Sequence, residues 1–134
     1  MNTDGVYIVT GATGGIGRAI TKALAARGCR VVLACRNTDK AERFINEPDS
    51  GGMDCDILPV DLSSLSSVRE AAVEAASRHY KINALINNAG TMPGRLTITD
   101  DGYEEATQTN FIATALFSRL LAPLISTGGS VVFT

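Results

Sequence analysis

The sequence lacks the features that are typical of membrane-spanning and nucleic-acid-binding proteins. No apolar run reaches the roughly 18 residues that a membrane-spanning helix needs. The net charge is only −2, so no basic field is present to attract nucleic acid or an anionic membrane surface. The N-terminal residues MNTDGVYIVT lead directly into a predicted strand, which argues against a signal peptide. We therefore expect neither a nucleic-acid partner nor a membrane association.

Cysteine and histidine are also scarce. The three cysteines, Cys29, Cys35 and Cys55, are odd in number and show no metal-ligand spacing. They are interpreted as reduced, partly buried thiols of a cytoplasmic protein. The single histidine, His79, falls near the end of a predicted helix and is expected at the surface. No metal site is predicted.

A glycine-rich segment is the first informative feature that is present. Residues 10–17 read TGATGGIG, after the apolar run 6–9 and before a helical apolar pattern that ends near Gly28. The order of strand, glycine-rich turn and helix is typical of a dinucleotide phosphate site, because the helix N-terminus presents unpaired N–H groups to the phosphates. The alternative is a purely structural glycine turn.

Each glycine of this segment has a predicted role. Gly11 can adopt the backbone angles of the tight turn. A middle glycine lets backbone N–H groups approach a pyrophosphate, and Gly17 lets the helix pack close to the strand. The spacing fits two patterns, because Gly11, Gly15 and Gly17 match T-G-x-x-x-G-x-G while Gly11, Gly14 and Gly17 match T-G-x-x-G-x-x-G.

A second motif, Asn87-Asn88-Ala89-Gly90, follows another apolar strand. With the glycine segment it makes the chain resemble the short-chain dehydrogenase/reductase family over essentially all 134 residues. The first glycine spacing is similar to the compact single-domain oxidoreductases, and the second to the larger sugar-nucleotide epimerases and dehydratases. The motif at 87–90 favours the compact group, and the run 87–111 is similar to retinol-dehydrogenase-like relatives.

The alternation of strand and helix patterns predicts an α/β fold, a Rossmann-type doubly wound parallel sheet with helices on both faces. The resemblance implies strand order 3-2-1-4-5. The segment 46–54 is turn-rich and is expected to be a mobile surface loop. Strands are expected near 6–10, 30–35, 55–60, 82–87 and 129–134, and helices near 14–27, 38–46, 64–79 and 101–125.

The end of the second strand is expected to choose between NAD and NADP. An acidic residue at this place selects NAD by binding the ribose 2′-hydroxyl. Cys35 stands there instead, and Arg36 follows with a planar fork that suits a phosphate. We therefore expect NADP, with NAD less favoured, although the basic residue that some NADP-preferring relatives carry before the middle glycine is replaced by Gly14. The alternative for Arg36 is a solvated loop charge.

The resemblance implies further cofactor contacts. Asp61 is expected to bond the adenine amino group and the Leu62 backbone N–H a ring nitrogen, although Asp61 could merely begin the turn into a helix capped by Ser63 or Ser64. Asn88 is expected to contact the ribose, and Asn87 to tie neighbouring strands together. The complete set expected to bind the cofactor is Gly11, Thr13, Gly15, Ile16, Gly17, Arg36, Asp61, Leu62, Asn88, Ala89 and Gly90.

Asn110 is the one catalytic candidate in the sequence. In the resembled family an asparagine at this place belongs to a proton relay, where its backbone carbonyl holds a water that reaches a catalytic lysine. The alternative is a plain polar residue on the exposed side of the helix. The same helix, near 101–125, implies a homo-oligomer, because it helps to form dimers in the family.

The other relay members are absent from these 134 residues. The family places a serine after the fifth strand and then a Tyr-x-x-x-Lys helix, and neither occurs before Thr134. We therefore expect residues 1–134 to form an NAD(P)-binding Rossmann domain that ends before the catalytic helix and is inactive alone. Its complete parent is expected to interconvert a small-molecule carbonyl and an alcohol. The alternative is a non-catalytic dinucleotide-binding module, a sensor or a partner-binding protein.

Overall fold

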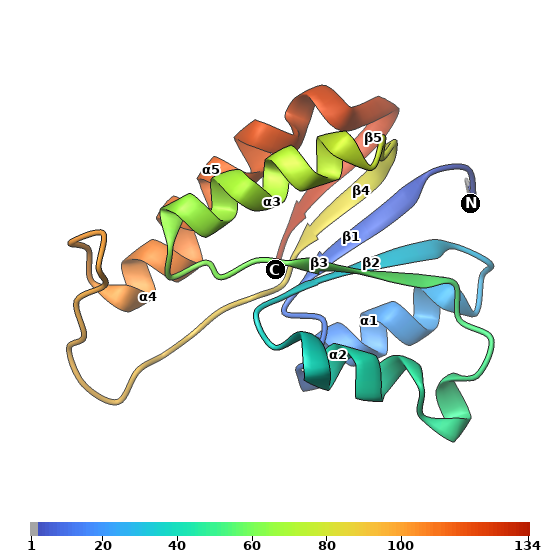
Figure 1. The fold of residues 1–134 in the computed structure, drawn as a ribbon, viewed down its shortest axis with the longest axis horizontal. Coiled ribbons are helices and arrows are strands. Elements are labelled where there is room, and N and C mark those ends of the chain that lie inside the picture. Colours follow the sequence, from blue (N-terminus) through green and yellow to red (C-terminus); the bar gives the residue numbers. More distant parts are fainter. Residues whose placement is uncertain (1–2) are drawn as a thin grey trace.

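A computed structural model describes residues 3–134; the first two residues of the expected domain lie outside the described part. Five parallel strands form one sheet in the order β3-β2-β1-β4-β5, which confirms the predicted Rossmann-type topology (Figure 1). The strands are β1 (Val6–Thr10), β2 (Arg30–Cys35), β3 (Cys55–Pro59), β4 (Ile82–Asn87) and β5 (Ile125–Phe133).

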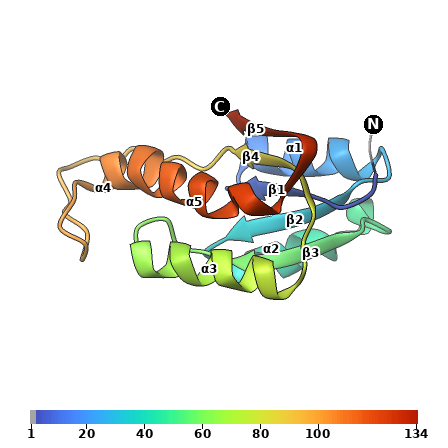
Figure 2. The same ribbon diagram turned by 90° about the horizontal axis from the view of Figure 1, so that it is seen from above.

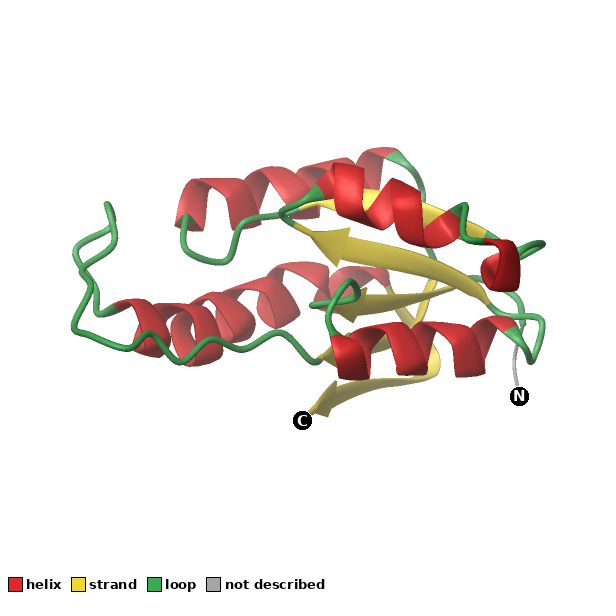
Figure 3. Ribbon diagram, turned by 90° about the horizontal axis from the view of Figure 1, so that it is seen from below, coloured by secondary structure: helices red, strands yellow, loops and turns green. Residues whose placement is uncertain are grey.

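The helices cover both faces of the sheet, as predicted (Figures 2 and 3). One face carries α1 and α2, and the other carries α3 and α5, while α4 lies beyond the end of the sheet (Figure 1). Their bounds are α1 (Gly15–Ala25), α2 (Thr38–Ile45), α3 (Leu65–Ser77), α4 (Glu105–Thr107) and α5 (Ala113–Leu121).

Successive residues of the central strand β1 point into two separate apolar cores. Val6 and Ile8 pack in the core beneath α3 and α5, whereas Tyr7 and Val9 pack in the core beneath α1 and α2. All five residues of β1 are buried, because a strand with helices on both faces has no solvent side. This explains why the strand appears in the sequence as an uninterrupted apolar run.

The predicted helix at 101–125 is wrong at both ends and in its middle. Residues before Glu105 form a hairpin-like turn, in which Thr99 N–H donates to the Tyr103 carbonyl at 2.8 Å. A π-helical segment, Gln108–Ile112, separates α4 from α5. A 3-10 turn at Ala122–Leu124, containing Pro123, ends the helix, because proline has no N–H to continue it. Strand β5 consequently starts at Ile125 rather than at 129.

The segment expected to be a mobile loop, 46–54, is tethered to α1. It contains a 3-10 turn at Pro48–Ser50. Arg18 forms an ion pair with Glu47 at 2.6 Å, and Lys22 forms one with Asp49 at 2.7 Å. The basic face of α1 therefore holds the connection between α2 and β3, which the turn-rich composition could not reveal.

Three smaller features complete the fold. His79 is exposed and has a positive φ of 57° just beyond α3. Among the described residues, no disulfide bond joins Cys29, Cys35 or Cys55. Within residues 3–134, no helix is long and apolar enough to cross a membrane, and no group of three or more potential ligands could hold a metal ion.

Candidate functional site

The glycine-rich turn between β1 and α1 packs too closely for side chains at two of its positions. Gly11 has φ +61°, and a Cβ there would lie 2.9 Å from the Ala89 Cα. A Cβ at Gly17 would lie 2.0 Å from the Gly11 carbonyl oxygen. A Cβ at Gly15 would meet nothing within 4 Å. The turn therefore needs Gly11 and Gly17 for packing, while Gly15 leaves open space in front of the helix.

The N-terminus of α1 has the properties of an anion site. Its N-cap, Gly14, makes no side-chain capping hydrogen bond, and the first turn contains no acidic residue. Ile16 lies in this turn with an exposed side chain. The positive end of an 11-residue helix is thus left without a side-chain counter-charge. Phosphate groups bind readily at such helix ends.

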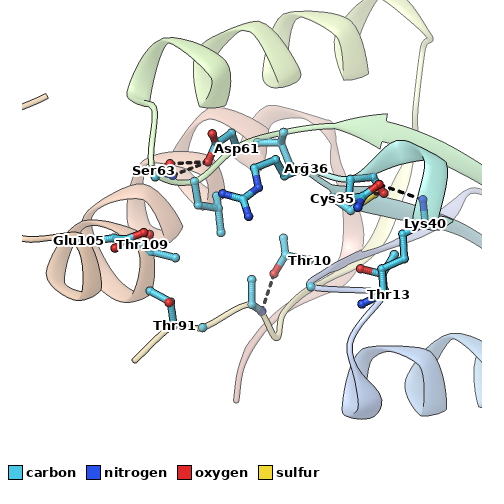
Figure 4. Close-up of a pocket in the computed structure, with 17 residues that line it drawn as sticks. Thr10, Thr13, Cys35, Arg36, Lys40, Asp61, Ser63, Thr91, Glu105 and Thr109 are labelled. Atoms are coloured by element: carbon cyan, nitrogen blue, oxygen red, sulfur yellow. Dashed lines mark hydrogen bonds between the residues drawn. The ribbon is translucent and has the colours of Figure 1, made fainter. Parts of the chain in front are cut away.

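A cavity of about 400 Å³ opens at the carboxyl ends of β1 to β4, beside this turn (Figure 4). In doubly wound sheets ligands bind at this edge. Seven predicted cofactor residues line the cavity: Gly11, Thr13, Arg36, Asp61, Leu62, Ala89 and Gly90. The predicted residues that do not line it are Gly15, Ile16, Gly17, Asn88 and Asn110.

Two cations lie at the turn after β2. Arg36 points its guanidinium into the cavity, and Lys40, from the first turn of α2, lines the same side (Figure 4). Among residues 3–134, neither cation takes part in an ion pair. Sequence reasoning missed Lys40, although its place four residues after Arg36, just inside a helix capped by Asn37, was the available signal.

Cys35 occupies the position at which an acid would select NAD. Its side chain is buried, and the burial raises the pKa of the thiol. The thiol therefore stays neutral near pH 7 and adds no negative charge beside Arg36 and Lys40. This end of the cavity is therefore lined by positive charge, whereas a site that binds an unphosphorylated ribose carries an acidic residue for the 2′-hydroxyl.

Asp61 has the turn-forming role that the sequence left open, and its contact with adenine stays a prediction. Its Oδ1 accepts hydrogen bonds from the backbone N–H of Ser63 at 2.9 Å and from the Ser63 hydroxyl at 2.6 Å. This is the turn into α3, whose N-cap is Ser64. Asp61 nevertheless lines the cavity (Figure 4). One carboxylate oxygen holds the turn, and the carboxylate as a whole borders the space where a ligand would lie.

The two asparagines of the second motif bond different elements. Asn87 was expected to tie neighbouring strands together, and its backbone carbonyl accepts from the Thr134 N–H, just beyond β5, at 3.2 Å, while its side chain donates to Ser118 of α5 at 3.0 Å. The Asn88 side chain instead joins β4 to the turn after β1, by donating to the carbonyls of Thr10 and Gly11, each at 3.3 Å. Asn88 therefore supports the glycine turn from behind rather than facing the cavity.

Asn110 lies in the π-helical segment and is exposed. It is not a plain surface residue, because its side chain pairs twice with the backbone of Thr91. Asn110 Oδ1 accepts from Thr91 N–H at 2.8 Å, and Asn110 Nδ2 donates to the Thr91 carbonyl at 2.9 Å. Thr91 lines the cavity directly after Gly90, so Asn110 holds that wall in place.

No tyrosine of the chain could act as the general acid of a Tyr-x-x-x-Lys pair. Tyr7, Tyr80 and Tyr103 are followed four positions later by Gly11, Ala84 and Thr107. Tyr7 is buried in the core. Tyr80 lies just before β4, at the amino ends of the strands, whereas the cavity lies at their carboxyl ends. The cavity therefore combines an anion site and cations with no tyrosine among its lining residues.

Comparison with known proteins gives one consistent family. A sequence profile described as short chain dehydrogenase matches residues 5–134. The dehydrogenase/reductase SDR family member FEY of Arabidopsis thaliana is 40% identical over 133 residues, covering 93% of this chain and 35% of that protein. The polyprenol dehydrogenase of Mus musculus is 35% identical over 127 residues, covering 93% of this chain and 38% of that protein.

Solved structures agree with the fold. The active-site complex of Pseudomonas aeruginosa RhlG with NADP superposes with a TM-score of 0.76 at 28% identity, over 92% of this chain and 51% of that chain. The chain spans less than half the length of the curated relatives it matches.

Proposed function

The chain belongs to the short-chain dehydrogenase/reductase family of oxidoreductases, and from that premise we propose that it binds NADP in the cavity at the carboxyl ends of its strands. The observation that carries the proposal is the pair of unpaired cations, Arg36 and Lys40, beside a neutral Cys35. RhlG, a relative in fold, is an NADP complex, which supports the same choice.

The residues present fit such a cofactor along its length. The N-terminus of α1, with open space at Gly15, would hold the pyrophosphate. Arg36 and Lys40 would hold the 2′-phosphate by charge-assisted hydrogen bonds. Asp61 and Leu62 border the adenine, and Ala89 and Gly90 leave room for the second ribose. Asn88 acts on binding through the turn that it supports.

Titrations with the two reduced cofactors, NADPH and NADH, test this assignment. The chain is expected to bind NADPH about tenfold or more tightly than NADH, because each hydrogen bond to the charged phosphate contributes about 1.5–3 kcal/mol. Arg36→Ala should remove most of this preference. Arg43→Ala is the matched control, since Arg43 is an exposed arginine in the last turn of α2 that does not line the cavity. Equal affinities in the unaltered chain would overturn the NADP assignment.

For the whole protein we propose an NADP-dependent interconversion of a small-molecule carbonyl and an alcohol. The bound cofactor supplies or accepts the hydride. Asn110 contributes to the proton relay, and its two hydrogen bonds to Thr91 set the wall next to the reacting end. The names of the relatives, which include dehydrogenases and reductases, support this class of reaction.

A non-catalytic dinucleotide-binding module is the second candidate. Reading the gene beyond codon 134 separates the two proposals. A Tyr-x-x-x-Lys helix there supports the oxidoreductase, and a stop codon supports the binding module.

We further propose a cytoplasmic homo-oligomer. The three free cysteines support a reducing compartment. The helical segment α4–α5 exposes Phe111 and Leu120, which would pack against a second copy. Sedimentation of the protein at several concentrations tests the association, and a strictly monomeric species would exclude it.

A further inference from the structure

A fully buried glutamine, Gln108, lies close to the cavity without lining it. Gln108 is the first residue of the π-helical segment, and none of its surface is exposed. A buried carboxamide is costly unless both its oxygen and its nitrogen find partners. Its hydrogen bonds are therefore informative about what the residue does.

The Gln108 side chain connects the π-helical segment to two other segments, the turn that contains Thr99 and Asp101 and the turn that contains Leu62. Its Oε1 accepts from the Thr99 hydroxyl at 2.5 Å, and its Nε2 donates to the Asp101 carboxylate at 2.8 Å. The same Nε2 also donates to the Leu62 carbonyl oxygen, 46 residues away in the chain, at 3.4 Å. A helix on one side of the cavity is thus bonded to the turn on the other side.

Asp101 closes the network on the same turn. Its Oδ2, which accepts from Gln108, also accepts from the Leu65 backbone N–H at 2.8 Å, at the start of α3. The turn 61–65 is therefore held at two points, the Leu62 carbonyl and the Leu65 amide, by a single pair of side chains. Both Gln108 and Asp101 lie outside the lining of the cavity.

The peptide group held by Gln108 also orients the Asp61 carboxylate. The Leu62 carbonyl and the Ser63 N–H belong to one planar peptide unit. Gln108 bonds the carbonyl end of that unit, and the N–H end donates to Asp61 Oδ1 at 2.9 Å. A rotation of this peptide would move the Asp61 carboxylate and displace Leu62 together, and both line the cavity.

From this chain of contacts we infer that Gln108, assisted by Asp101, is a positioning residue for the adenine side of the cofactor cavity. It contacts no part of the cavity itself and acts through the peptide between Leu62 and Ser63. The inference rests on the proposed function, because it concerns how that cavity recognises its ligand. The π-helical segment thereby supports both walls, since Asn110 in the same segment holds Thr91.

Adenosine 2′,5′-bisphosphate is the probe that isolates this effect, because it contains the adenine, its ribose and the 2′-phosphate without the nicotinamide half. Its affinity for the complete 134-residue chain is measured by calorimetry. Gln108→Leu, which keeps the volume and removes the hydrogen bonds, is expected to weaken binding about tenfold, the effect of one to two lost hydrogen bonds. Leu121→Ala is the control, since Leu121 is equally buried but lies in α5 away from the cavity.

Gln108→Glu adds a readout that loss of stability alone would not change. At pH 7 the new carboxylate cannot donate to the Leu62 carbonyl and repels Asp101, so binding weakens. Burial and the neighbouring Asp101 carboxylate raise the pKa of a carboxyl at this position, so as the pH falls from about 7.5 towards about 5 the carboxyl becomes protonated and regains a donor. The affinity of this variant relative to the unaltered chain should therefore recover several-fold on acidification.

A second pair of variants changes Asp101, the exposed partner of Gln108. Asp101→Asn keeps an oxygen acceptor for the Leu65 N–H and should bind the probe within about twofold of the unaltered chain. Asp101→Leu removes the acceptor and should weaken binding about three- to tenfold. Rescue by the amide but not by the apolar side chain is the signature of positioning.

The outcomes separate the two proposals. An unaltered chain that binds neither NADPH nor the bisphosphate overturns the proposed function, and the inference with it. An unaltered chain that binds, together with a Gln108→Leu variant of equal affinity, overturns the inference alone. Equal weakening in Gln108→Leu and Leu121→Ala at equal loss of stability shows a general structural role, which also overturns it.

Discussion

The carbonyl oxygen of Gly11 lies where a side chain of Gly17 would begin, because a Cβ built on Gly17 would stand only 2.0 Å from it. The contact joins the start of the turn after β1 to the first turn of α1. It fixes how the N-terminus of α1 is placed beside the cavity. The positive end of the helix and the turn that follows β1 are therefore one packed unit rather than two independent features.

Gly17→Ala is consequently expected to destabilise the fold by about 1–3 kcal/mol, the usual effect of overpacking at a site that cannot relax. Urea denaturation measures the loss. Gly15→Ala is the matched control, since its Cβ would meet nothing within 4 Å and should leave stability nearly unchanged. Equal stabilities for the two variants would contradict the packing role of Gly17.

Gly15→Val should separate binding from folding. The larger side chain would project into the open space in front of the helix, where the pyrophosphate is proposed to lie, so binding of both NADPH and NADH should be lost. Gly94→Val is a suitable control, because Gly94 is exposed, does not line the cavity and would also place its Cβ in open space with nothing within 4 Å. Unimpaired binding by Gly15→Val would place the phosphate site elsewhere.

Cofactor preference should respond to single changes at the turn after β2. Lys40→Ala is expected to weaken NADPH binding about threefold to tenfold and to leave NADH within about twofold, because only the 2′-phosphate approaches this cation. Cys35→Asp should shift the preference towards NADH, since it adds a carboxylate that repels the phosphate and accepts from a ribose hydroxyl. Fluorescence titration of both cofactors decides, and an unchanged ratio in both variants would contradict the assignment.

The sheet could be predicted from the sequence because its determinants are local. The apolar run of β1, the glycine turn and the Asn87–Gly90 motif each lie within a few residues, and the family resemblance supplied the strand order. The role of Gly11 in the tight turn was likewise predictable, and its φ of +61° confirms it. Arg36 and Asp61 could be expected in one cavity because the carboxyl ends of parallel strands share an edge.

What the sequence could not indicate depends on contacts between distant segments. Gln108 gave no signal, because its partner Leu62 lies 46 residues earlier and offers only a backbone carbonyl. The partners of the Asn87 and Asn88 side chains gave no signal either, because Ser118 lies 31 residues after Asn87, and the carbonyls of Thr10 and Gly11 lie 77 to 78 residues before Asn88. The π-helical segment inside the predicted long helix could not be predicted for a different reason. Apolar periodicity does not distinguish a π-helical turn from an α-helical one.

Acid should weaken the fold through Asp56 at the opposite end of the sheet. Burial raises the pKa of Asp56, but hydrogen bonds from Tyr80 and the Ile57 amide together with the charges of Arg78 and Arg30 outweigh it and leave the pKa lowered. A lowered carboxyl pKa contributes stability above the unfolded value of about 3.9, and this contribution is lost as the pH falls further through the folded value.

Tyr80→Phe should therefore cost about 1 kcal/mol of unfolding free energy near pH 6 and less at a second pH below about 3.9, because the contribution of the lowered Asp56 pKa declines from the unfolded value downwards. Urea unfolding at the two pH values measures the difference. Tyr103→Phe is the control, since that tyrosine is exposed and should show no pH-dependent effect. A cost that stays constant with pH would show that the Asp56 carboxylate is not the partner that matters.

A polypeptide of these 134 residues should show no carbonyl reductase activity against ketones and aldehydes while still binding NADPH. It contains Asn110 but no Tyr-x-x-x-Lys sequence, and a missing general acid removes a contribution of about 10²–10⁴ in rate.

The same polypeptide should associate, because β5 is an edge strand on which Val131, Val132 and Phe133 are 37%, 41% and 65% exposed. Val132→Lys should reduce the association, as measured by light scattering, without changing NADPH affinity. A monomeric and catalytically active chain would mean that another residue supplies the proton.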